Sequence, residues 1–248
     1  LYHTYGSRSV ARLLDRTGQF RKRGQKRYDD TSILIAQFVE AGWDIDVGHR
    51  ALTQMNHIHS HFKIPNDDFL FVLWTFIDFP IAWMGRFGWR PMSIHEQQAW
   101  FNFWVRIGQL MGIADIPVDK ATFDRFVDDY ETREMLPNPA SKNVAGATVT
   151  IMENWLPRLL RPLVQPVAAC LLRPRCLAAA GYSAPSPWLK GVVIAVLKFR
   201  ARIKRYVSFE RYPNLLASQY KRTYPLGDWS LEKLGPEYAH QKRAAGTD

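Results

Sequence analysis

Histidines occupy every second position of the segment MNHIHSHF, at His57, His59 and His61. On a β-strand, this spacing would place all three imidazoles on one face, as in a metal-binding sheet. On a helix, His57 and His61 would share a face, and His59 would point almost the opposite way. The chemistry open to these side chains therefore depends on the local structure.

The residues around the histidines favour a helix from Arg50 to Phe62. Within it, Leu52, Met55, His59 and Phe62 recur at intervals of three and four, which makes one apolar stripe. A strand would need a pairing partner, and the sequence offers no convincing series of alternating segments. We therefore predict that His59 faces the interior, while the other two histidines lie on the far side with Arg50.

An inward-facing histidine has two ordinary explanations: a neutral core imidazole bonded to the backbone, or a metal ligand. His57 and His61 could bind zinc from one face, but Ile58 stands where a zinc-binding HExxH motif would need its glutamate. A single inward His59 better suits the axial ligation of haem iron. Haem needs one protein ligand, an aromatic-lined slot and cations near its propionates.

The composition predicts a folded protein with a large core, because 47% of the 248 residues are hydrophobic and nine are Trp. The net charge of +10 is concentrated at the two ends. Residues 1–30 hold eight Lys/Arg against three acids, and residues 197–248 hold eleven against five. This distribution suits an anionic membrane surface or acidic ligand groups. We expect no nucleic-acid partner, since no zinc-finger or RNP pattern is present.

The cysteines and the longest apolar run bear on the location of the protein. Cys170 and Cys176 are predicted to be reduced core thiols. The run Phe69–Trp83 contains Asp78 and Pro80 and is shorter than the roughly 20 residues of a spanning helix. No signal peptide is visible. We therefore expect a cytoplasmic or peripherally membrane-associated protein in which no segment must cross a bilayer.

Helices dominate the predicted structure, and we expect an all-α, single-domain chain. Helices are predicted over 25–41, 50–62 and 119–131, from residues 66 and 93 onward, and over roughly 186–207, with a surface loop over 136–146. The segment beginning WLPRLLRPL, residues 155–174, is predicted to be a kinked helix packed on the core. Its alternative is an amphipathic element on lipid, with Arg158 and Arg161 near headgroups.

Several motifs resemble the MpaB/rubber-oxygenase catalytic domain family, which includes the latex-clearing proteins, and they are closest to its MpaB branch. The motifs are RYDDT, MNHIHSHFKIPNDDFLFVLWTF, W-x5-WRPMSIHEQQAWFNFWVRIGQLMGI and WLPRLLRPL. The resemblance covers residues 1–225, and residues 226–248 are then expected to form an irregular, basic C-terminal tail.

This resemblance implies an all-α fold with a globin-like helical core, a b-type haem and dioxygen as co-substrate. The implied reaction is oxidative cleavage of a carbon–carbon double bond in a hydrophobic, isoprenoid-like small molecule, which would reach the haem along the helix at Phe69–Phe79. Basic ends would hold the protein at membranes, where such molecules reside. A haem- or lipid-binding helical protein without turnover is the alternative.

The resemblance also assigns residues to a site. His59 matches the histidine that ligates haem iron, and Lys63 stands where the family often has Arg, about 40° from His59 on the predicted helix. Arg27 and Thr31 match an arginine and a threonine over the distal face, where they would stabilise bound oxygen. Asp30 replaces a lysine of the latex-clearing proteins, which puts a lysine-capped haem in doubt. We expect Asp30 to be a solvated acid.

Overall fold

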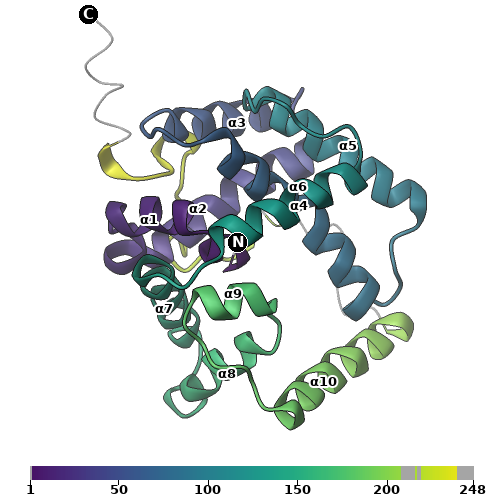
Figure 1. The fold of residues 1–248 in the computed structure, drawn as a ribbon. Helices are drawn as coiled ribbons and strands as arrows, with labels where there is room; N and C mark the ends of the chain where they lie inside the picture. Colours follow the sequence, from purple (N-terminus) through teal and green to yellow (C-terminus); the bar gives the residue numbers. More distant parts are fainter. Residues whose placement is uncertain (1, 208–215, 217–218, 239–248) are drawn as a thin grey trace, which may run out of the picture. The chain divides into compact units, whose positions relative to one another are not determined.

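Helices make up the regular structure of the chain (Figure 1). The computed structural model describes residues 2–207, 216 and 219–238, and no strand occurs among these residues, so the predicted all-α class is confirmed. The elements are η1 (Tyr2–Gly6), α1 (Arg8–Thr17), α2 (Gln19–Ala41), α3 (Asp46–His59), α4 (Asn66–Phe87), α5 (Ile94–Leu110), α6 (Lys120–Glu134), α7 (Pro139–Glu153), η2 (Arg158–Leu163), α8 (Val164–Ala169), α9 (Pro174–Ala179), α10 (Pro187–Tyr206) and η3 (Leu231–Lys233).

The chain divides into two compact units. Unit 1 comprises Leu1–Gly18 and Asn66–Phe209, and it contains η1, α1 and α4 to α10. Unit 2 comprises Gln19–Pro65 and Glu210–Asp248, and it contains α2, α3 and η3.

Helix α4 forms the centre of unit 1, where it packs against α5, α6 and α10. Among the described residues, it is the one helix long and apolar enough to cross a membrane. However, it carries two buried acids, Asp68 and Asp78. Asp68 accepts hydrogen bonds from Ser9 Oγ and from the Tyr130 hydroxyl, both at 2.6 Å. Buried acids that accept hydrogen bonds in this way are typical of a core helix in a folded domain.

Helix starts in unit 1 follow their capping residues. The predicted start at Ser93 is confirmed, because Ser93 and Glu96 form both bonds of a capping box. The predicted surface loop over 136–146 is wrong, since α7 begins inside it. Asn138 Oδ1 accepts a hydrogen bond from Ser141 N at 2.9 Å, and Pro139 occupies the first helical position. An Asn-Pro pair that resembles a turn is here a helix start.

The segment 155–174 is not one kinked helix packed on the core, and this prediction is wrong. It forms the short elements η2 and α8, and none of the residues of η2 is buried. Leu159 is 88% exposed. The prediction for Cys170 and Cys176 is confirmed, because both are buried and free.

Unit 2 is built on the antiparallel pair α2 and α3. Helix α2 ends as predicted before Gly42, which has a φ of 82°, but it begins at Gln19 and breaks at Arg23. A Cβ atom on Gly48 of α3 would lie 1.7 Å from the carbonyl oxygen of Gly42. The first turn of α3 therefore lies against the backbone of Gly42, just after the end of α2, and only glycine fits at position 48.

The C-terminal segment, residues 219–238, packs on α2 and α3. Leu234 is fully buried, and its carbonyl oxygen accepts a hydrogen bond from Gln54 Nε2 at 2.8 Å. The described part of 226–248 is largely irregular and includes the three-residue η3. It is not the basic tail that we predicted, because residues 226–248 hold three Lys/Arg and four Asp/Glu. Residues 239–248 lie outside the described part.

Candidate functional site

His59 is the last residue of α3, and it lies half-buried at the edge of the helix face that Ala51 and Ile58 bury. Burial lowers the pKa of His59 to about 4, and the nearby positive charge of Arg27 contributes in the same direction. The imidazole is therefore neutral at neutral pH. A neutral imidazole keeps a nitrogen lone pair, which is the form that binds a metal ion.

Arg27 and Thr31 lie one turn apart on α2 and are bonded to each other. Arg27 Nη1 donates to Thr31 Oγ1 at 3.0 Å, and the Thr31 hydroxyl donates to the Arg27 carbonyl oxygen at 2.9 Å. The single proton of the hydroxyl is thus directed at the helix backbone. Thr31 therefore orients the guanidinium, and the structure brings Arg27, Thr31 and His59 together within unit 2.

Lys63 does not share a helix face with His59. The prediction of a helix over 50–62 is wrong at both ends, because α3 begins at Asp46 and ends at His59. Lys63 lies beyond this end and is exposed. The 40° separation expected from helical geometry therefore does not apply to it.

His57 and His61 form a pair of their own. Their ring centroids lie 4.9 Å apart, edge to face, and His61 Nδ1 lies 2.8 Å from the His57 carbonyl oxygen. The ring of Tyr238 lies 5.9 Å from that of His61. No group of three His, Cys, Asp or Glu side chains suited to a metal ion occurs among the described residues. A zinc site on this pair would need further ligands.

Asp30 is buried, so the prediction of a solvated acid is wrong. Its carboxylate accepts hydrogen bonds from Lys26 Nζ at 2.5 Å, from the Tyr224 hydroxyl at 2.7 Å and from Gly235 N at 2.9 Å. Two of these donors belong to the C-terminal segment. Asp30 therefore anchors that segment to α2, one turn from Arg27.

Replacing Asp30 with Ala should lower the free energy of unfolding by about 3 kcal/mol, because the Lys26 ammonium and two hydrogen-bond donors lose their acceptor in a buried place. Urea denaturation would measure this change. Asp46→Ala is the matched control: Asp46 is an exposed acid that pairs with Arg50, and its loss should cost less than about 1 kcal/mol. Equal effects for the two variants would contradict the anchoring role of Asp30.

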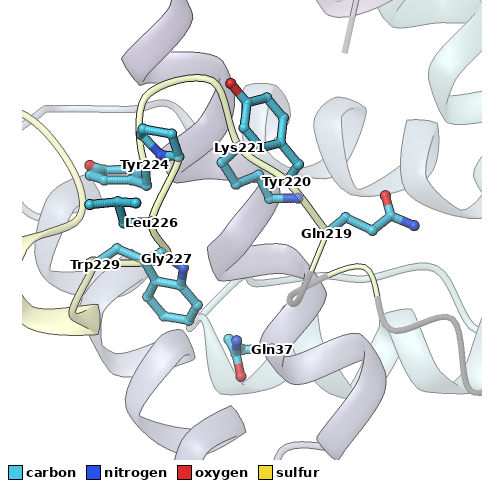
Figure 2. A pocket seen from close by; sticks show the side chains of 9 residues that line it. Gln37, Gln219, Tyr220, Lys221, Tyr224, Leu226, Gly227 and Trp229 are labelled. Atoms are coloured by element: carbon cyan, nitrogen blue, oxygen red, sulfur yellow. The ribbon is translucent and has the colours of Figure 1, made fainter.

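A hollow of about 950 Å³, open to solvent, lies between α2 and the C-terminal segment (Figure 2). Gln37 lines it from α2, and Tyr220, Lys221, Tyr224 and Trp229 are among the residues that line it from the segment. Two of its polar groups are committed to the fold, since the Tyr224 hydroxyl donates to a buried carboxylate and Lys221 Nζ donates to a backbone carbonyl. The hollow does not include the three site residues gathered on α2 and α3.

Unit 1 contains a second titratable cluster, which the sequence did not reveal. His3 Nε2 lies 2.7 Å from Glu131 Oε1, and Asp78 accepts from Arg173 Nη2 at 2.5 Å and pairs with Lys120 Nζ at 2.7 Å. Burial lowers the pKa of His3. These residues lie far apart in the sequence, so no spacing could indicate them. The cluster joins the N-terminus to α4, α6 and the start of α9, which is a structural role.

Comparison with known proteins identifies similar chains. A family model described as "ER-bound oxygenase mpaB/B'/Rubber oxygenase, catalytic domain" matches residues 7–202. The ER-bound oxygenase mpaB' of Penicillium brevicompactum is 30% identical in an alignment of 236 positions that covers 88% of this chain and 56% of that protein. The ER-bound oxygenase mpaB of Penicillium roqueforti (strain FM164) is 29% identical over 66% of this chain and 61% of its own. The chain thus spans somewhat more than half the length of these relatives.

Proposed function

Because the chain belongs to the ER-bound oxygenase mpaB/B'/rubber oxygenase catalytic domain family, we propose that it is a haem b-dependent oxygenase. It oxidises or cleaves a carbon–carbon double bond in a hydrophobic, isoprenoid-like molecule with dioxygen. The observation that carries this proposal is the neutral imidazole of His59 beside the positive charge of Arg27 in unit 2.

The residues of the site have the chemistry that would hold a haem group. A half-buried neutral imidazole would suit ligation of iron, and a guanidinium would suit a haem propionate. His59 would hold the iron, with Arg27 close by and Thr31 behind it. When bound, haem supplies the activation of dioxygen and the oxidation of the alkene. Lys63, which is exposed and lies outside α3, is left out of the proposed site.

The protein's own residues keep the ligand available and fix the charge beside it. The pKa of His59, about 4, lies below the ordinary value of 6.5. Protons therefore do not compete for the imidazole until the pH falls well below 6. Thr31 accepts a hydrogen bond from the guanidinium of Arg27 and so holds that charge in one orientation. A fixed charge stabilises developing negative charge better than a mobile one does.

The location of the protein follows from its relatives and its proposed substrate. The relatives are named ER-bound oxygenases, and an isoprenoid-like molecule collects in a bilayer. The protein is accordingly a peripheral membrane protein in this proposal, placed where its substrate is most concentrated.

Product analysis separates an oxygenase from the alternative, a haem or lipid carrier without turnover. The haem-loaded protein would be incubated with a prenylated aromatic compound under ¹⁸O₂, and the products would be analysed by mass spectrometry. We expect a shortened or oxidised side chain that contains ¹⁸O. A protein that retains haem but returns the compound unchanged, across several prenyl chain lengths, would support the carrier instead.

A further inference from the structure

One side of α10 exposes a continuous row of large apolar side chains, which we call the outer face. Trp188 is 77% exposed, Phe199 63% and Tyr206 78%. The row consists of Trp188, Val192, Val196, Phe199, Ile203 and Tyr206. Their spacing of three and four residues keeps all six within an arc of about 80° around the helix axis.

The outer face is not needed for packing within unit 1. Helix α10, a straight helix in Figure 1, packs against α4 and α8 through its opposite side. On that side, Ala201 is buried and Val193 and Leu197 are half-buried. A helix at the surface of a soluble domain normally carries polar residues on its outward side. An exposed row of this size instead marks an interaction surface.

The charge around the outer face selects its partner. Residues 154–209 contain ten Lys/Arg and no Asp or Glu. The charge of this segment therefore equals the net charge of the whole chain, +10. Helical geometry places Arg200 and Arg202 on the two flanks of the row, each about 40° beyond its edge. An apolar row between two basic flanks is the arrangement of a helix that lies in the headgroup region of a bilayer.

We infer that the outer face of α10 docks the protein on an anionic lipid bilayer, with the row in the acyl region and the flanking arginines at lipid phosphates. This inference deepens the proposed membrane association, and it rests on neither haem nor turnover. The face is about 30 Å long, as expected for a 20-residue helix.

Vesicle flotation with the 248-residue chain tests this inference. We expect binding to vesicles of phosphatidylcholine with 30% phosphatidylserine, a blue shift of the Trp188 emission, and weaker binding at high salt. The double substitution Val196→Ser and Phe199→Ser should weaken binding tenfold or more, roughly the loss expected for two apolar side chains. Arg200→Gln with Arg202→Gln should weaken binding to the anionic vesicles by a similar factor.

The matched control is Ile94→Ser with Val118→Ser, which replaces two exposed apolar residues outside α10 and should leave binding unchanged. Circular dichroism would show that each variant keeps its helices, since all the changed side chains are exposed.

Absence of vesicle binding would overturn the inference, as would equal binding by the α10 variants and the control. So would a concentration-dependent dimer that the α10 substitutions abolish while vesicles have no effect, because the outer face would then meet a second copy. None of these readouts needs haem, so they stand whether or not the oxygenase proposal holds.

Discussion

His59→Ala should abolish the retention of haem while leaving the protein folded. The side chain is half-buried at the end of α3, so its loss removes the proposed iron ligand but only a modest amount of packing. Without this ligand, haem would be bound more weakly, and we expect it to be lost on gel filtration. The ratio of haem absorbance to protein absorbance after that step measures the effect.

His57→Ala is the control, because this neighbour lies on the same helix and pairs with His61 instead. It should retain haem at the level of the parent protein. Added imidazole should restore haem binding to the His59 variant in part, since it can occupy the vacated place. If the His57 variant lost haem and the His59 variant kept it, the ligand would be on the other side of α3.

Gly48→Ala should cost at least about 4 kcal/mol of folding free energy or prevent unit 2 from folding. The new Cβ atom would lie 1.7 Å from the Gly42 carbonyl oxygen and 3.4 Å from Phe38 Cα. These contacts are with backbone, which cannot rotate away, so the start of α3 would have to shift away from Gly42 and the end of α2. A shift of α3 as a whole would also change the position of His59 relative to Arg27. Urea denaturation and haem retention would measure both consequences.

Gly191→Ala is the matched control for this substitution. Gly191 lies within α10, and a Cβ atom there would meet nothing within 4 Å. Alanine should therefore stabilise this helix slightly, by up to about 1 kcal/mol. A Gly48 variant as stable as the parent would show that the close approach of Gly48 to Gly42 is not a feature of the folded protein.

Local patterns in the sequence predicted several helices and the relative placing of some candidate site residues. The capping box of Ser93 and the glycine after Ala41 are short-range signals, and both mark helix ends in the structure. The side-by-side placing of Arg27 and Thr31 was also predictable from a short-range signal, since residues four apart share a helix face. The placing of His59 on the inward side of its helix required only that this segment be predicted as a helix.

The predictions were wrong where a local pattern is ambiguous, or where residues distant in the sequence determine whether a side chain is buried. The helix around the histidines ends at His59 although no glycine or proline occurs before Pro65, so the prediction carried Lys63 onto its face. Asp30 is buried by Tyr224 and Gly235, about 200 residues away, and no spacing reveals such a pairing. The outer face of α10 was missed because periodicity shows which residues share a face but not whether anything covers it.

The absorption spectrum of the purified protein, prepared with an adequate supply of haem, tests the central claim most directly. We predict a Soret band that co-elutes with the protein and disappears in His59→Ala but persists in His57→Ala. A parent protein without a Soret band after haem loading, or a band unchanged by the His59 substitution, would contradict haem binding through His59.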